Sequence, residues 1–232
     1  MPTLKYYGHS AFRIQDEKHT VFIDPFITGN PVCPSKVEEI RACHYILVTH
    51  GHADHLGDTE FLAKKHDATV IATWELAMWL KKRGLKVHPL GAGGGYEFPF
   101  GRVKATLAFH GCGADPREDG SVPPPNTPVG YVVQWGKTKT LYHAGDTALY
   151  GDMKLLAEDY DLDVACLPIG DNFTMGVADA NKAAEWLKAK TYVPMHYNTF
   201  EIIKADPLNF AFHVEKHGAK CKVMSPGEKI TF

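Results

Sequence analysis

The segment Thr49-His-Gly-His-Ala-Asp-His55 places four metal-ligand side chains within six positions, directly after a compact apolar run. Such a run predicts a buried strand, so the four side chains follow a strand end. In an extended segment, residues two apart point the same way, and His50 and His52 can therefore bind one ion together. Asp54 and His55 follow where the chain turns toward a helix, which directs them at a second, adjacent ion. Imidazole and carboxylate ligands suit Zn²⁺ and related divalent metals, so the segment predicts a metal centre rather than a solvated polar loop.

Three further residues of the same chemical types each follow an expected strand. They are His110, Asp146 and His196. A single histidine after a strand is more often a structural residue than a ligand. Together with the segment 50–55, however, these residues place ligand types on four strand ends, which is where α/β folds build their sites.

The order of these residues resembles the pattern of the metallo-β-lactamase superfamily, and the resemblance covers nearly the whole chain. It implies an α/β fold, a four-layer αββα sandwich of two mixed sheets flanked by helices, in a single domain over residues 1–232. It also implies a binuclear site with two divalent metal ions. The implied ligands are His50, His52 and His110 for one ion, Asp54, His55 and His196 for the other, and Asp146 as a bridge between them.

Shorter motifs are similar to a bacterial and archaeal family of metal-dependent hydrolases related to L-ascorbate-6-phosphate lactonase. The motifs are Gly8-His9-Ser10-Ala11, His143-Ala-Gly-Asp146-Thr147, Pro168-Ile169-Gly170 and Asn172-Phe173-Thr174-Met175-Gly176. One position departs from that pattern, because Asp171 stands where a second glycine is expected.

The resemblance assigns supporting roles to two further histidines. His9 would lie beside the metals and donate a proton to the leaving group; the alternative is a hydrogen-bonded turn residue. His143 would orient Asp146 or pack beneath the metals. Cys112 follows His110 closely, but we expect it to fill the loop rather than bind metal.

Elsewhere, strands precede helices through most of the chain, while hairpins occupy its beginning and middle. This alternation predicts one mixed α/β domain with two sheets. We expect one helix over Leu56–Lys65, another over Trp74–Arg83 capped by Thr73, and a late strand at Lys222–Met224. The glycine-rich run Gly91–Gly95 lacks the residues of a phosphate-binding loop and predicts a flexible turn.

A second histidine pair, His213 and His217, has the i, i+4 spacing of a helical chelate. Glu215 is misplaced for a zinc-protease motif, and histidines near a helix C-terminus are favoured by the helix dipole. We therefore interpret this pair as surface residues.

Composition and net charge limit the classes of partner that the chain is expected to bind. The chain has 25 basic and 27 acidic residues and a net charge of −2, which argues against nucleic acid or an anionic membrane as a partner. No apolar run approaches the ~18 residues of a membrane span. The five cysteines are scattered without a C-x-x-C pair, and the N-terminus lacks a signal peptide. We expect a cytoplasmic protein that acts on a small molecule, with homo-oligomer formation left open.

These features predict a metal-dependent hydrolase. Two ions sharing a water would lower its pKa from about 15.7 toward ~7, and the resulting metal-bridging hydroxide would attack a small ester, lactone or phosphoester. Asp54 would hold the nucleophile in line, and Gly111–Pro128 would form a lid. Zn²⁺ is the expected metal, with Mn²⁺ or Fe as alternatives. The alternative functions are a phosphodiesterase and a non-catalytic metal-binding scaffold.

Overall fold

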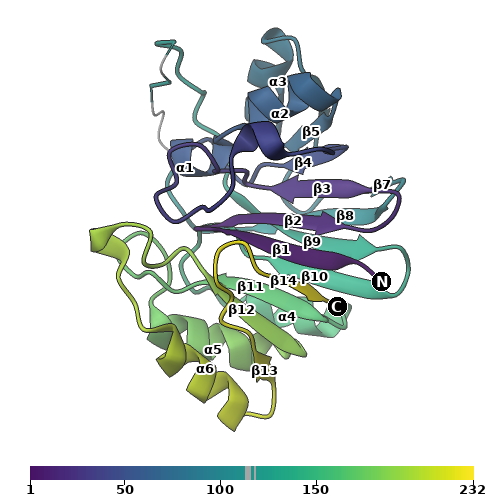
Figure 1. The fold of residues 1–232 in the computed structure, drawn as a ribbon. Coiled ribbons are helices and arrows are strands. Elements are labelled where there is room, and N and C mark those ends of the chain that lie inside the picture. The colour runs from purple at the N-terminus through teal and green to yellow at the C-terminus, as the bar shows by residue number, and fades with distance from the viewer. Residues whose placement is uncertain (113–115, 118) are drawn as a thin grey trace.

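The computed structural model describes residues 1–112, 116–117 and 119–232. Its strands form two sheets of seven strands each, and helices pack against the outer face of each sheet (Figure 1). The prediction of a sandwich of two mixed sheets flanked by helices is confirmed.

The two sheets are built from opposite halves of the chain, apart from the last strand. The first contains, in spatial order, β14 (Lys229–Thr231), β1 (Thr3–Gly8), β2 (Ala11–Gln15), β3 (Thr20–Ile23), β4 (Tyr45–Leu47), β5 (Thr69–Ala72) and β6 (Lys86–Pro89). The second contains β13 (Lys220–Cys221), β12 (Thr191–Met195), β11 (Val164–Pro168), β10 (Lys139–His143), β9 (Val129–Trp135), β8 (Gly101–Leu107) and β7 (Gly95–Phe98).

In the described part of the chain, three helices accompany each sheet. On the first sheet lie α1 (Ala53–Leu56), α2 (Thr59–His66) and α3 (Trp74–Lys82), and with the second lie α4 (Met153–Asp159), α5 (Val177–Leu187) and α6 (Pro207–Lys216). Short 3₁₀ turns occur at Val37–Glu39 and Glu201–Ile203. Among the described residues, no helix is long and apolar enough to cross a membrane.

Strand directions follow the same order in both sheets. Neighbours from β14 to β3 and from β7 to β10 pair antiparallel, whereas neighbours from β3 to β6 and from β10 to β13 pair parallel. Parallel neighbours end at the same edge of a sheet, so the loops after β4, β10 and β12 are brought to sheet edges where a site can form.

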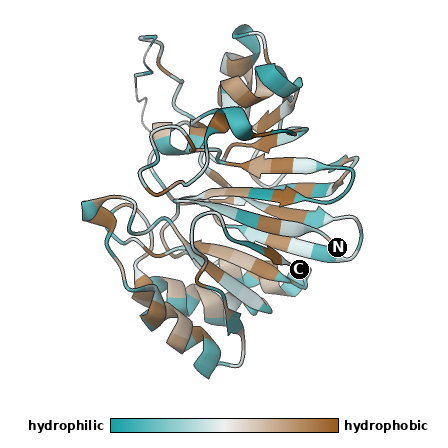
Figure 2. Ribbon diagram, in the orientation of Figure 1, coloured by the Kyte–Doolittle hydropathy of each residue, from teal (hydrophilic) through white to brown (hydrophobic). Residues whose placement is uncertain are grey.

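The central strands β3 and β4 are apolar on both faces, as expected for strands that are covered on both sides. Ile23 and Leu47 point into the core between the sheets, whereas Phe22 and Ile46 point outward and pack with Leu76 of α3. All five side chains are fully buried. Figure 2 shows hydrophobic segments running along the strands in the middle of the molecule. The alternation fixes the strand register and hence the loops that follow it.

The helix predicted over Leu56–Lys65 is confirmed over most of its length as α2, which begins at Thr59, whereas Leu56 ends the separate short helix α1. Gly57 separates them with φ +38° and ψ −126°. A Cβ at this position would lie 2.5 Å from the carbonyl oxygen of Pro25. Asp58 then accepts hydrogen bonds from two backbone amides of the loop after β3, at 2.8 and 3.0 Å. The break therefore joins the metal-ligand segment to the preceding loop.

Other differences concern short elements. The strand predicted at Lys222–Met224 is wrong, because pairing with β12 ends at Cys221. The chain then turns, and the amide of Gly227 donates to the carbonyl of Tyr6 as the chain enters β14. The sequence analysis also missed β6, β7 and α4, and β7 begins at Gly95, the last residue of the predicted glycine-rich turn.

Gly57→Ala is expected to lower the free energy of unfolding by about 2 kcal/mol or more, because a left-handed alanine costs ~1–2 kcal/mol and its Cβ would overlap a backbone carbonyl. Urea unfolding at constant m-value measures the loss. The matched control is Gly151→Ala, because Gly151 has no atom within 4 Å of the added Cβ and its φ lies outside the left-handed region. Its stability should change by less than about 0.5 kcal/mol. An equally small change in Gly57→Ala would contradict this account of the helix break.

Candidate metal centre

Loops at one edge of the sandwich carry all the predicted ligands. His9 lies in the β1–β2 turn, His50–His55 span the end of β4 and α1, His110 follows β8, Asp146 follows β10 and His196 follows β12. In Figure 1 these loops lie on the left of the view, on the far side from both termini. Both sheets therefore contribute to one group of side chains.

Three histidines form a first cluster. His50 Nε2 lies 2.9 Å from His52 Nδ1, and His110 Nε2 lies 3.3 Å from the same nitrogen. The His52 and His110 rings are perpendicular, at 90°. Since an imidazole lone pair lies in the ring plane, the three rings can direct one nitrogen each toward a shared point. The structure thus brings together the set predicted for one ion.

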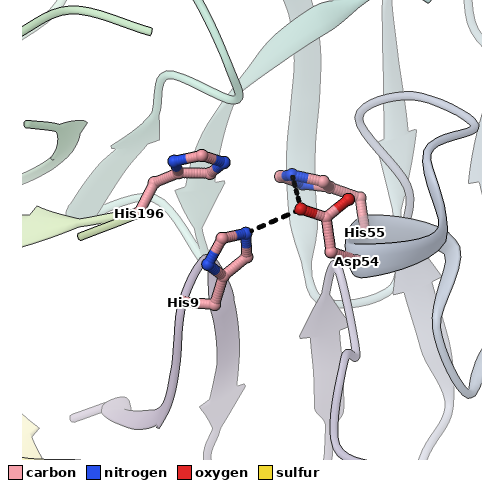
Figure 3. Close-up of side chains that lie close together, drawn as sticks. All are labelled: His9, Asp54, His55 and His196. Carbon is pink, nitrogen blue, oxygen red and sulfur yellow. Dashed lines mark hydrogen bonds and ion pairs between the residues drawn. The ribbon is translucent and has the colours of Figure 1, made fainter. Parts of the chain in front are cut away.

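A second cluster contains Asp54, His55, His196 and His9 (Figure 3). His9 Nε2 lies 2.9 Å from Asp54 Oδ2, and His55 Nε2 lies 3.9 Å from the same oxygen. The rings of His9 and His196 are 4.1 Å apart between centroids. The structure brings together the three residues predicted for the other ion and adds His9 to them.

Asp146 lies between the two clusters. Its Oδ2 is 2.9 Å from His196 Nε2 and 3.2 Å from His55 Nε2, both in the second cluster. The same oxygen is 3.7 Å from His110 Nε2 of the first cluster. His50, His55 and Asp146 also offer ligand atoms within 4.8 Å of one another. One carboxylate is therefore in reach of ligands from both clusters.

The charges around His55 favour a cation at the centre. Burial by itself lowers the pKa of His55, but Asp146, Asp54 and Asp24 raise it well above its ordinary value. Burial raises the pKa of Asp146, yet His196 and His55 hold it well below the usual range. Three carboxylates around one imidazole stabilise positive charge, whether as a proton on His55 or as a metal ion.

Asp24 and Thr49, which the sequence analysis did not select, orient two of the histidines. Asp24 Oδ1 accepts the Thr49 amide at 2.8 Å, and Oδ2 accepts the Thr49 hydroxyl at 2.7 Å and His55 Nδ1 at 2.8 Å. Because the hydroxyl donates to Asp24, it accepts from His50 Nδ1 at 2.9 Å. Both histidines therefore carry a hydrogen on Nδ1 and direct Nε2 at the centre. The available sequence signal was Asp24-Pro25 after a strand, which by itself marks only a strand boundary.

His9 lies behind Asp54 and is fully buried. Burial, first among opposing effects that include the Asp54 hydrogen bond, lowers its pKa to about 4. A neutral His9 donates its Nε2 hydrogen to Asp54 and accepts at Nδ1 from the Thr199 hydroxyl, 3.0 Å away. The ring therefore fixes the orientation of the Asp54 carboxylate.

His143 contacts backbone groups rather than the carboxylate of Asp146. Its Nδ1 accepts from the amide of Gly145 at 3.2 Å, and its Nε2 donates to the carbonyl of Ser10 at 3.0 Å. Both ring nitrogens are thereby occupied. The fully buried ring connects the end of β10 to the turn that carries His9.

The backbone around the centre is strained. Five of its non-glycine residues have left-handed φ values: His9 (57°), Asp24 (45°), Asp171 (61°), His196 (53°) and Asn198 (56°). Such conformations cost ~1–3 kcal/mol each and persist where the surroundings determine them. Here the amide of His196 donates to the carbonyl of His9 at 2.8 Å, which ties two of these residues together. The value for Asp171 also explains why a glycine is expected at that position.

The donor set fits a metal. His55 Nε2 and Asp146 Oδ1 are buried and, within the described part of the chain, make no hydrogen bond of good geometry, since the 3.2 Å approach of His55 Nε2 to Asp146 Oδ2 is an ion-pair contact only. An unsatisfied buried polar atom costs ~1–3 kcal/mol, so two of them facing one centre call for a ligand. Imidazole and carboxylate groups together suit transition-metal ions, and His50, His52 and His110 complete the set.

A cavity of about 280 Å³ opens onto the centre. Its lining is His52, Asp54, His110, Asp146, Phe173 and His196. Phe173 is 53% exposed and is the apolar member of this described lining, which contains no lysine or arginine. A larger cavity, of about 630 Å³, lies between α5 and α6 and touches none of these residues.

The predicted lid, Gly111–Pro128, lies partly outside the described residues. Where it is described, Cys112 Sγ lies 2.6 Å from Asn126 Oδ1, and the Asn126 amide donates to the threonine hydroxyl that precedes α3. Asp119, in the same segment, pairs with Arg83 at the C-terminal end of α3, where Arg83 Nη2 lies 2.5 Å from Asp119 Oδ2. The segment is thus attached to both ends of α3, and its closing over the site stays a prediction.

Comparisons with known proteins agree with this geometry. Residues 19–197 match the β-lactamase superfamily domain. The chain is 51% identical over 227 residues to a UPF0173 metal-dependent hydrolase of Anoxybacillus flavithermus, covering 98% of both chains. It is 50% identical over 229 residues to one of Bacillus cereus, covering 98% of this chain and 99% of the other.

Solved structures show the same fold. Igni18, a metallo hydrolase from the hyperthermophilic archaeon Ignicoccus hospitalis, has a TM-score of 0.88 and 34% identity over 100% of this chain and 98% of its own. An isothiocyanate hydrolase from Delia radicum gut bacteria shares the fold, with a TM-score of 0.77 and 19% identity over 99% of this chain and 98% of its own.

Asp24→Asn is expected to weaken metal binding about 10–100-fold. The amide nitrogen of the new asparagine would direct its hydrogens at the Thr49 hydroxyl and at His55 Nδ1. His55 would then carry its own hydrogen on Nε2, so the lone pair that Nε2 directs at the centre would be lost. Competition with a chromophoric chelator measures the affinity. The control is Asp16→Asn, which also removes a carboxylate with several hydrogen bonds but contacts none of the clustered residues. Equal affinities in the two variants would remove this role of Asp24.

Proposed function

The chain belongs to the β-lactamase superfamily and to its UPF0173 metal-dependent hydrolases, and on this premise we propose that it is a binuclear hydrolase of a small ester, lactone or phosphoester. One observation carries the proposal: Asp146 Oδ2 lies within 3.7 Å of histidines from both clusters. The proposed ligands are His50, His52 and His110 for one ion, Asp54, His55 and His196 for the other, and Asp146 for both.

The donor chemistry favours Zn²⁺, with Mn²⁺ or Fe as the alternatives. The proposed set contains five histidines and two carboxylates, and imidazole-rich sites suit zinc and iron, whereas oxygen-rich sites suit Mn²⁺ and Mg²⁺. Structural zinc sites close with four protein ligands. A seven-residue set beside a cavity therefore supports an enzyme over a non-catalytic scaffold.

Divalent ions held there would lower the pKa of a shared water to about 7 and polarise the substrate oxygen. Asp54 lines the cavity with a side chain that is 31% exposed. Its carboxylate is therefore placed to accept a hydrogen from the attacking water and orient that water. His9 holds the carboxylate from behind through the 2.9 Å hydrogen bond.

We assign His9 as a positioning residue rather than as the acid that protonates the leaving group. It is fully buried and does not belong to the cavity lining, so it reaches the substrate only through Asp54. His143 has a comparable positioning role without contacting Asp54, because it connects β10 to the backbone of Ser10, next to His9.

The cavity favours a substrate with an apolar group beside the scissile bond. Phe173 supplies the apolar wall, and the described lining offers no lysine or arginine for a separate anionic group. An ester or lactone fits this surface best. A phosphodiester is the second candidate, because two adjacent clusters match the two-ion arrangement that binds the attacking and leaving oxygens of in-line displacement.

Two metal ions per chain are expected, and Asp146→Asn should lose one of them. Without the shared negative charge, two cations ~4 Å apart repel by about 4 kcal/mol per unit charge pair at an effective dielectric of 20. Turnover should fall at least ~10²-fold. Elemental analysis after gentle purification gives the stoichiometry, and Asp67→Asn, an exposed carboxylate paired with Lys86, is the control. A ratio at or below one after metal is added would overturn the binuclear centre.

Hydrolysis of aryl esters or lactones is expected, and a chelator should abolish it. Phe173→Ala should raise the KM for aryl esters about tenfold relative to the KM for alkyl esters, with little change in kcat. The reason is that the phenyl ring contributes binding energy that is equal in the ground state and the transition state. A panel that also contains bis-aryl phosphodiesters ranks the substrate classes. Phe212→Ala on α6, where the phenylalanine is 71% exposed, is the matched control. Activity that survives complete metal removal would show that the metal centre is not the catalyst.

A further inference from the structure

We propose that α5 and α6 carry a separate metal site formed by Glu185, His213 and His217. His213 Nε2 lies 2.9 Å from Glu185 Oε1, and His217 Nε2 lies 3.8 Å from the same oxygen. One ligand atom from each residue lies within 4.8 Å of the other two. The sequence analysis interprets the histidine pair as surface residues, and it did not select Glu185, which lies 28 residues before His213 on another helix.

The histidines are oriented before any ion binds. His217 Nδ1 donates to the carbonyl of His213 at 2.9 Å, so its Nε2 keeps a lone pair and faces Glu185. Metal-bound histidines usually donate their other ring hydrogen in this way. The i, i+4 spacing places both rings on one face of α6, 4.4 Å apart between centroids and 33° between planes. Binding of an ion would therefore cost little side-chain conformational entropy.

Helix geometry supplies part of the charge for a cation. Glu185 lies in the last turn of α5, His213 lies in the last turn of α6, and His217 caps α6. The carbonyls at a helix C-terminus carry partial negative charge and favour a cation nearby. Two such termini converge here, and the Glu185 carboxylate adds a full negative charge.

Nearby lysines decide which cations can bind. Lys188, Lys190 and Lys220 line the same cavity of about 630 Å³. Lys190 is paired with two aspartates, at 2.8 and 3.1 Å, so its charge is largely compensated. The remaining positive charge disfavours ions that are held by charge alone, such as Mg²⁺ and Ca²⁺. Imidazole donors select Zn²⁺, Ni²⁺ or Cu²⁺ instead.

The site is accessible and distant from the hydrolytic centre along the fold. The side chains of His213, Glu185 and His217 are 28%, 44% and 48% exposed, so an ion can enter and keep water as further ligands. The C-termini of α5 and α6 lead directly into β12 and β13, whereas His196 follows the opposite end of β12. An ion here would therefore join α5 to α6 without touching the residues assigned to hydrolysis.

The experiment uses untagged, full-length protein and Zn²⁺ alone as the probe. Equilibrium dialysis followed by elemental analysis should find one more Zn²⁺ on the wild type than on the double variant His213→Ala/His217→Ala. This difference does not depend on how many ions the hydrolytic centre holds. Because a ligand that binds only the folded chain raises its stability, added Zn²⁺ should raise the Tm of the wild type more than that of the double variant. Hydrolytic activity should be equal in both.

Two single variants sharpen the test. Glu185→Gln should weaken the additional Zn²⁺ at least about tenfold, since it replaces a charged ligand by a neutral one. His19→Ala is the matched control, because His19 also faces a carboxylate, Asp16 at 3.9 Å, but has no second imidazole in a ligand cluster. Equal Zn²⁺ content in the folded double variant and the wild type overturns the site. If the double variant does not fold, unchanged affinity in Glu185→Gln overturns it.

Discussion

Three carboxylates, from Asp24, Asp54 and Asp146, surround the fully buried imidazole of His55, and the arrangement of the site depends on this concentration of negative charge. Burying charge without compensation costs several kcal/mol per ion, so the fold must place cations or proton donors among these groups. Histidines meet this requirement because an imidazole can donate a hydrogen to a carboxylate through one nitrogen and keep the other nitrogen for a metal ion or a second hydrogen bond. The hydrogen from His55 to Asp24 and that from His9 to Asp54 are examples.

The centre also requires both sheets. The first sheet supplies the segment 50–55 after β4, and the second supplies His110, Asp146 and His196 after β8, β10 and β12. The two halves have the same order of strand directions, yet neither holds a complete ligand set. Packing of the two inner faces is therefore what brings the clusters within a few ångströms of each other. The strand register therefore determines two things at once: which apolar side chains are buried between the sheets, and where the loops that carry the site residues begin.

Sequence reasoning works where local pattern carries the information. Alternation and apolar runs located most strands, and the spacing of His50, His52, Asp54 and His55 singled out a segment whose side chains do lie together in the fold. It failed where a residue matters only through a distant partner. Asp24 acts through Thr49, which lies 25 positions away, and nothing within its own segment marks that contact.

The separation of α1 from α2 at Gly57 also depends on a residue that is distant in the sequence. The side-chain pattern around Gly57 is compatible with a continuous helix, and the need for glycine shows only in the fold, where a Cβ would lie 2.5 Å from the carbonyl oxygen of Pro25. The partnership of Glu185 with His213 and His217 likewise joins two helices whose separate sequences each look like ordinary solvent-facing surfaces. Parallel packing of α5 and α6 creates it, because crossovers between parallel strands return their helices side by side with both C-termini at one end. The same architectural rule thus places a proposed set of ligands at each end of β12. Those at its carboxyl end are buried on loops, and those at its amino end lie on helices and are accessible to water.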